Sequence, residues 1–350
     1  MSIKTDLHAA ARRALGEELH RYVQGQPIDL AEGAGDPNEA AFAAYRLIPR
    51  TMRGQAGIDL ATPFFGEDLP APLAVGAYAA DRLLSPDGIG PIAKVCHALG
   101  LPLIVSEECI TPLAEIAAMH GRLWLQLRAA GPKDRVLRLV DEAARHGARG
   151  VVLTVLAPVH PRPGLHPGGV DIAGRIGERG WSTIGDPSGV AALPPFPAWS
   201  WTDVADVQRH AAAAGLAVIA KGILHPDDGA AALETGCAGL LVSNIGARQF
   251  GRWVAAVDRI GTVRARCGDK AAILVDGGIR NGGDIVIASL LGADIAVVVR
   301  PVILALAAGG ESAVRRLLLS LIDETAAIAS WMGAAKLGDL GADQIIRAQA

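Results

Sequence analysis

The sequence has 350 residues, of which 51% are hydrophobic and 4% aromatic, and its formal net charge is −3 at pH 7. A chain of that length accommodates one (β/α)8 barrel with extensions, and a composition dominated by Ala, Gly, Val and Leu is typical of short helices packed on buried strands. Acidic and basic residues are mixed along the chain, which argues against nucleic-acid and membrane partners and favours small-molecule chemistry.

The N-terminal region, residues 1–71, is expected to be an extension that precedes the barrel. It has helical spacing from about residue 4 to residue 23 and is irregular after that. The start, MSIKTDLHAAARRALGEELH, has no continuous apolar signal core, and the most apolar run, Ile295 to Gly309, is interrupted by Arg300 and Pro301. Because the four cysteines form no CxxC pair, we expect buried thiols in a reducing cytoplasm.

Eight short segments rich in Val, Ile and Leu then alternate with segments of helical spacing, which is the pattern of repeated βα units. The expected strands are residues 72–78, 102–106, 123–127, 150–155, 216–222, 239–244, 271–278 and 295–301. Proline, threonine or acidic residues mark several helix starts, at residues 111–112, 201–203 and 225–228. Eight such units predict a single domain, residues 1–350, built as a (β/α)8 TIM barrel.

A long insert, residues 157–200, separates the fourth strand from its helix. It is rich in proline and glycine, and a loop of this length in a compact domain is usually a lid or a binding loop. We expect it over the mouth of the barrel, with Trp181, Trp199 and Trp201 holding its later part. Its two histidines, His160 and His166, are more typical of exposed loop residues than of catalytic groups.

The active site of such a barrel lies at the carboxyl ends of the strands. The seventh and eighth strands end in DGGIR and VRP. A glycine-rich turn with available backbone N–H groups, beside Arg280 and Arg300, indicates a phosphate-binding site. Taken alone, the DGG turn is also compatible with a tight connection between strand and helix.

Several motifs resemble those of the FMN-dependent 2-hydroxy-acid dehydrogenase and oxidase family, which includes glycolate and lactate oxidases. They are YRLIPRTMRG at 45–54, PLAVGAYAADRLLSPDG at 72–88, LQLR at 125–128, SNIGARQ at 243–249, DGGIRNGGDI at 276–285, LLGADIAVVVRP at 290–301 and MGAAKLGDL at 332–340. Because these motifs follow the family's order over nearly the whole chain, the resemblance implies the family's barrel, its FMN cofactor and its oxidoreductase activity.

The resemblance also implies which residues bind FMN. Ser106, Gln126 and Thr154 would bond the edge of the flavin ring, and Lys221 would face N1 and O2, where a cation stabilises the anionic reduced flavin. Residues from Asp276 onward would hold the ribityl chain and the phosphate. Val299 stands where the family has glycine, so we expect crowding there with the backbone N–H retained. The full set is Ala77, Ser106, Gln126, Thr154, Lys221, Asp276, Gly278, Arg280, Val299 and Arg300.

The substrate side departs from the family pattern. The family writes SNHGGRQ, in which the histidine takes a proton from the substrate, and this chain has Ile245 at that position. Where the family has an aspartate that orients the histidine, at the end of the fourth strand, this chain has Leu156. Isoleucine cannot accept a proton, and a buried carboxylate without its imidazolium partner would be costly. The two changes agree with each other and predict altered chemistry.

The groups that would contact the substrate have also changed. Of the two family arginines that bind the substrate carboxylate, Arg248 remains, while the other aligns with Pro163. Two family tyrosines that contact the substrate align with Arg21, beside Tyr22, and with Arg128. The pocket therefore gains positive charge, although Arg21 alone is equally compatible with a surface cation.

Two adjacent glutamates, Glu107 and Glu108, follow the second strand. Either could pair with Arg128 or Arg21, and one could act as an acid or base if burial raises its pKa. The alternative for each is a solvated loop residue or a structural ion pair. The candidates for the reacting centre are Lys221, Arg248, Glu107, Glu108 and Arg128.

The sequence therefore predicts an FMN-dependent oxidoreductase that acts on an anionic or amphoteric small molecule other than a simple 2-hydroxy acid. One alternative is a catalytically inactive relative that binds FMN or another ligand and acts through a partner. Another is a flavin-dependent isomerase or lyase without net redox change. We expect no metal site and a homo-oligomer, for which a tetramer is one possibility.

Overall fold

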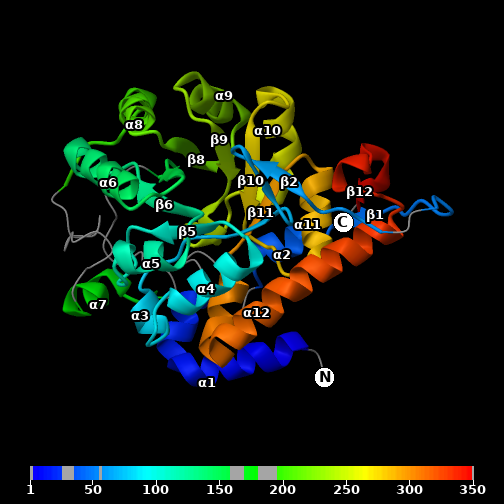
Figure 1. Ribbon diagram of the computed structural model, residues 1–350, viewed down its shortest axis with the longest axis horizontal. Coiled ribbons are helices and arrows are strands. Elements are labelled where there is room, and N and C mark those ends of the chain that lie inside the picture. The colour runs from blue at the N-terminus through cyan, green and yellow to red at the C-terminus, as the bar shows by residue number, and fades with distance from the viewer. Residues whose placement is uncertain (1–2, 26–34, 55–56, 158–168, 180–194, 349–350) are drawn as a thin grey trace.

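Eight parallel strands close into a barrel in the computed structural model (Figure 1), which describes residues 3–25, 35–54, 57–157, 169–179 and 195–348. The strands are β4 (Leu73–Val75), β5 (Leu103–Ser106), β6 (Leu123–Arg128), β7 (Gly150–Thr154), β8 (Ala217–Ile223), β9 (Gly239–Val242), β10 (Ala272–Asp276) and β11 (Ile295–Val298). All eight predicted strands are confirmed. The predicted ends were wrong by two or more residues for β4, β9, β10 and β11, because the chain leaves the ladder earlier there to form the loops of the site.

An outer ring of helices covers the strands, as the βα pattern predicts. It is made of α4 (Gly90–Leu99), α5 (Leu113–Met119), α6 (Lys133–Arg145), α8 (Trp201–Ala213), α9 (Pro226–Glu234), α10 (Ile260–Cys267), α11 (Gly282–Leu290) and α12 (Arg300–Trp331). Shorter elements are α3 (Asp81–Leu84), the hairpin β2 (Thr62–Phe64) and β3 (Glu67–Leu69), and the pair β1 (Tyr45–Leu47) and β12 (Ile345–Arg347). Four 3-10 turns complete the described structure: η3 (Ile245–Ala247), η4 (Ala256–Arg259), η5 (Leu337–Asp339) and η6 (Ala342–Gln344).

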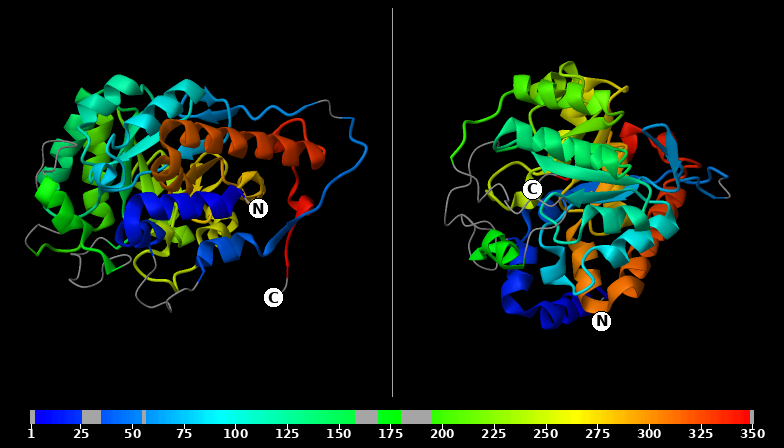
Figure 2. Two further views of the ribbon diagram at one scale, coloured as in Figure 1. Left: turned by 90° about the horizontal axis from the view of Figure 1, so that it is seen from below. Right: turned by 60° about the vertical axis from the view of Figure 1, so that its left-hand side comes forward.

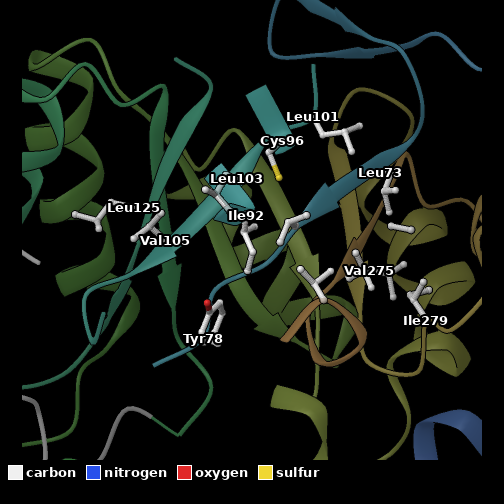
Figure 3. Close-up of a cluster of buried hydrophobic side chains, with 14 of the residues drawn as sticks. Leu73, Tyr78, Ile92, Cys96, Leu101, Leu103, Val105, Leu125, Val275 and Ile279 are labelled. Carbon is white, nitrogen blue, oxygen red and sulfur yellow. The ribbon is translucent and has the colours of Figure 1, made fainter. Parts of the chain in front are cut away.

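The core has two layers, because buried parallel strands bear apolar side chains on both faces. The outer layer lies between strands and helices. Figure 3 shows part of it, with Leu73 and Leu103 of the strands near Ile92 and Cys96 of α4. The inner layer fills the barrel, and the aromatic hairpin β2–β3 closes its amino end. The rings of Phe64 and Trp124 lie 5.5 Å apart there. The carboxyl end is therefore the end left for a ligand.

The N-terminal extension begins with α1 (Ile3–Gln24), which confirms the helix predicted over residues 4–23. This helix lies along α12 (Figures 1 and 2) and is interrupted at Gly16, whose φ of 73° is favourable only for glycine. The short helix α2 (Pro37–Phe42) follows, with Asp36 as its N-cap. Together they bring the end of α1 and the start of α2 to the carboxyl end of the barrel.

Only part of the predicted insert lies within the described residues. Helix α7 (Ile172–Arg179) packs Ile176 against Ala79 and Ile110, which belong to the loops after β4 and β5. Trp199 donates from its indole N–H to the carbonyl oxygen of Gly131 at 2.9 Å, so this residue does hold the later part of the insert. His160, His166 and Trp181 lie outside the described residues.

Candidate active site

A pocket opens at the carboxyl end of the barrel, and we call it the mouth pocket. The space between its lining residues, open solvent included, is about 1350 Å³. Loops after the strands line it, together with Tyr22, Val23 and Asp36 of the N-terminal extension. All ten residues predicted to bind FMN line this pocket: Ala77, Ser106, Gln126, Thr154, Lys221, Asp276, Gly278, Arg280, Val299 and Arg300.

The strand register places the ring-edge candidates side by side. Ser106 is opposite Gln126 across β5 and β6, and Thr154 is opposite Lys221 across β7 and β8. The Gln126 side-chain amide donates to Thr154 Oγ1 at 3.0 Å, and Ser106 Oγ accepts from the Glu108 backbone N–H at 3.0 Å. These contacts fix the side chains in a polar row that suits the carbonyl and imino groups of a flavin ring.

The Lys221 side chain is held by two partners inside the mouth pocket. Its ammonium donates to Ser243 Oγ at 2.9 Å and forms an ion pair with Asp276. The other carboxylate oxygen of Asp276, Oδ1, is buried and has no hydrogen-bond partner among the described residues. A buried acceptor normally has a partner, so this oxygen fits a ligand hydroxyl, such as those of a ribityl chain.

The glycine-rich turn after β10 needs its glycines. Gly277 and Gly278 have φ of 86° and 90°, a region that other residues rarely adopt. A Cβ on Gly278 would lie 2.7 Å from the carbonyl oxygen of Asn38, so the turn also packs closely on α2. Arg280 and Arg300 follow at the same end of the pocket. Burial lowers the pKa of Arg300 to about 10, although Asp36 beside it acts in the opposite direction.

Val299, predicted to crowd the cofactor site, is accommodated by a glycine that follows the neighbouring strand, β4. A Cβ on Gly76 would lie 2.6 Å from Val299 Cγ2 and 2.7 Å from Val297 Cγ1. The larger side chain at position 299 therefore fits because residue 76 has none.

The Gly76→Ala variant is expected to lose about 1–3 kcal/mol of unfolding free energy, because it overpacks this contact. Adding Val299→Gly should recover part of the loss, since only the Val297 contact would remain. Urea unfolding of the two single variants and the double variant measures the coupling. Additive losses would show that the two positions do not share this space.

The turn that should carry the base has an unusual backbone. Ile245, Gly246 and Ala247 all have positive φ, at 55°, 65° and 56°. Left-handed geometry costs about 1–2 kcal/mol at a non-glycine residue, so the surroundings must hold the turn. Asn244 does so through its side-chain oxygen, which accepts from the Ala247 N–H at 3.1 Å, and Ser243 Oγ accepts from the Ile245 N–H at 3.0 Å.

The two adjacent glutamates point to different places. Glu107 is fully buried and does not line the mouth pocket; its carboxylate accepts from the Arg135 guanidinium and from the Arg128 backbone N–H, both at 2.8 Å. The structure thus places Glu107 in a structural ion pair and not at the predicted reacting centre. Burial raises the pKa of Glu107, and Arg135 opposes that shift. Glu108 does line the pocket, and its carboxylate lies 3.4 Å from the Arg128 guanidinium.

Arg248 is the pocket cation without a carboxylate partner within 4.0 Å in the described part of the chain. Its guanidinium lies 4.7 Å from the ring centre of Tyr22 and donates to the Val23 carbonyl at 3.4 Å. Burial lowers the pKa of Arg248, whereas the Glu108 carboxylate raises the pKa of Arg128. Arg21 is exposed, so the aromatic residue next to it is the one that α1 brings to the site.

The arrangement supplies cations and polar groups but no imidazole. None of the described residues that line the mouth pocket is a histidine, and Ile245 and Leu156 both line it. The catalytic and cofactor roles given to these residues remain predictions. Sequence reasoning missed Asp36 and Asn38, which precede the barrel, and Arg135, which partners Glu107.

The sequence matches the FMN-dependent dehydrogenase family over residues 11–347. It is 32% identical over 352 residues to 4-hydroxymandelate oxidase of Amycolatopsis orientalis, with 96% of this chain and 95% of the relative covered. It is 31% identical over 342 residues to 2-hydroxyacid oxidase 1 of Homo sapiens, with 91% and 89% covered.

Solved structures of mandelate oxidase variants have the same fold. One with 2-hydroxy-phenylacetamide superposes with a TM-score of 0.83 at 31% identity and covers 99% of this chain and 98% of that one. Another, with a monooxide FMN adduct, has a TM-score of 0.82 at 30% identity and covers 97% and 98%. The barrel and the FMN cofactor predicted from the sequence are confirmed.

Proposed function

The chain belongs to the FMN-dependent dehydrogenase family, and from that membership we propose an oxidoreductase that oxidises an amphoteric small molecule at a carbon bonded to nitrogen. The observation that carries the proposal is the apolar pair Ile245 and Leu156 in the mouth pocket, where the resemblance expects a histidine and its aspartate. A reaction in this pocket has to proceed without that base.

Oxidation of an alcohol needs a base and oxidation of an amine does not. When a hydride equivalent leaves a carbinol carbon, the hydroxyl proton must leave as well, which is why a general base contributes about 10²- to 10⁴-fold to such steps. A neutral amine has a lone pair that forms the C=N bond as the C–H bond breaks. Bound FMN supplies the acceptor for the two electrons and the hydrogen. Water then hydrolyses the iminium product to a carbonyl compound and an ammonium ion.

The charges of the pocket support a substrate that bears both signs. Arg248 has no carboxylate within 4.0 Å among the described residues and can bind an anionic group of the substrate. Glu108 offers a carboxylate to an ammonium group and can accept its proton before the oxidation. The Glu108 carboxylate already has one cation beside it, the Arg128 guanidinium at 3.4 Å.

Matched pairs of 2-amino and 2-hydroxy acids test the proposal, because the two members of a pair differ only in the reacting heteroatom. Phenylglycine and mandelate are one such pair. We expect amino acids of such a panel to bleach the flavin of the anaerobic holoprotein, faster as pH rises and the amine becomes neutral. The 2-hydroxy acids should leave it oxidised. Robust turnover of a 2-hydroxy acid would refute the proposal. If the holoprotein binds compounds of the panel but none of them reduces its flavin, the alternative of a catalytically inactive, ligand-binding relative would be favoured.

We also propose a reducing compartment and a homo-oligomeric assembly for this chain. All four cysteines lie in the described part of the chain and none is bonded to another, which is compatible with a reducing cytoplasm. No helix in the described ranges combines the length and the apolar character needed to cross a bilayer. A homo-oligomer remains a prediction, to be measured by sedimentation or light scattering.

A further inference from the structure

One carboxylate oxygen lies between the two arginines assigned to the flavin phosphate. Asp36 Oδ2 accepts from Arg300 Nη1 at 2.5 Å and from Arg280 Nη2 at 2.8 Å. The Asp36 side chain is only 12% exposed and lines the mouth pocket. An oxygen anion that accepts from two guanidinium groups has the bonding expected of a phosphate oxygen.

The protein already engages every nitrogen of these two guanidinium groups. The remaining nitrogens of Arg280 donate to Glu39 and to the Ile279 carbonyl, and those of Arg300 donate to the Val23 and Gly246 carbonyls. The formal charges of Arg280, Arg300, Asp36 and Glu39 sum to zero. A phosphate dianion at this end therefore meets neutralised arginines and a nearby carboxylate of its own sign.

Asp36 also connects the phosphate end to the turn that carries Ile245. Its other oxygen, Oδ1, accepts from the Asn38 N–H at 2.9 Å and caps α2. The side-chain oxygen of Asn38 accepts from Asn244 at 2.8 Å, immediately before Ile245. These hydrogen bonds fix the position of the Asp36 carboxylate within the fold of the N-terminal extension. Asp36 is therefore not a freely rotating surface side chain.

We propose that Asp36 is a specificity-determining residue of the cofactor site, whose carboxylate competes with the FMN phosphate for Arg280 and Arg300. The competition reduces the preference of the site for FMN over riboflavin, which has the same ring and ribityl chain but no phosphate. The proposal uses the family's cofactor and is independent of the substrate proposed above.

The test compares Asp36→Asn with Glu39→Gln in the full-length protein. Asparagine is as good an N-cap as aspartate, so α2 is retained. Glu39→Gln is the matched control, because it also removes one negative charge from Arg280 but lies outside the pocket lining. Release of FMN and riboflavin on dilution and their rebinding, followed by flavin fluorescence, give the two dissociation constants without an activity assay.

Asp36→Asn is expected to lower the Kd for FMN at least tenfold, or about 1.4 kcal/mol, with riboflavin unchanged within about twofold. Glu39→Gln should change either Kd by less than about threefold, since an exposed charge is screened. Unchanged or weaker FMN binding in Asp36→Asn would overturn the proposal, because Asp36 would then serve to orient the arginines. An equal decrease in the Kd values for FMN and riboflavin would also overturn the proposal, because it would indicate a general opening of the pocket and not a competition with the phosphate. If the asparagine variant does not fold, Asp36→Ser, which keeps an N-cap oxygen, replaces it in the same comparison of the two Kd values, with the same expected result.

Discussion

The double variant Ile245→His with Leu156→Asp is expected to oxidise 2-hydroxy acids at least about 10²-fold faster than the natural sequence, the lower end of what a general base contributes. Both positions line the mouth pocket. The backbone is already suitable, since Ile245 has a φ of 55° and histidine adopts left-handed geometry more readily than a β-branched residue. Anaerobic flavin bleaching with mandelate or lactate measures the effect.

The single variants serve as controls for the pair. Ile245→His alone supplies an imidazole that no carboxylate orients, so a smaller gain is expected. Leu156→Asp alone introduces a carboxylate into an apolar position without a partner, and the free energy of unfolding should fall by about 1–3 kcal/mol. The histidine should then restore part of that stability. If neither the double variant nor the singles bleach with any 2-hydroxy acid, the missing base is not what separates this chain from hydroxy-acid chemistry.

The barrel could be predicted because its strands are buried on both faces and read as continuous apolar runs. The ends of the strands could not, since the residues that leave the ladder, such as Gly277, are apolar or small like those within it. The ten positions predicted to bind FMN follow from motif order at strand ends, and the structure gathers all of them into one pocket.

Contacts over long sequence separation could not be predicted. Asp36 lies 244 residues from Arg280 and 264 from Arg300, and nothing in the irregular stretch around it marks it as a pocket residue. The sequence also could not show which of two adjacent residues faces the pocket. Consecutive side chains at a strand end point in different directions, so Glu107 turns to Arg135 while Glu108 faces the pocket.

At Ile245 the motif could be recognised from the sequence, but the left-handed backbone conformation of the turn could not. The resemblance locates the substituted base, but isoleucine and alanine give no sign of positive φ, because glycine, asparagine and histidine are the residues that favour it. The partners that hold the turn, Ser243 and Asn244, are part of the same motif. The conformation therefore depends on the neighbours and not on the residue that adopts it.

Substitution of two arginines by methionine should have opposite effects on ligand preference and on stability, and the contrast separates a ligand-binding cation from a structural one. Arg248 is half-buried and Arg135 is buried. The natural sequence should bind mandelate about 10²-fold or more tightly than its neutral analogue 2-hydroxy-phenylacetamide. Arg248→Met is expected to abolish this difference in affinity. The folded protein should lose no more than about 1 kcal/mol, mainly from the contact with Tyr22. Burial lowers the pKa of Arg248, so the fold already disfavours its charge.

Arg135→Met provides the opposite case. Arg135 is 3% exposed and its guanidinium lies 2.8 Å from Glu107, so its removal leaves a buried carboxylate without that cation and should cost about 3–5 kcal/mol. The preference for mandelate should survive, since neither partner lines the mouth pocket. Perturbation of the flavin spectrum under anaerobic conditions gives both ligand affinities, and urea unfolding gives the stabilities. A loss of stability in Arg248→Met comparable to that in Arg135→Met would make Arg248 a structural residue, and another cation would have to bind the anionic group.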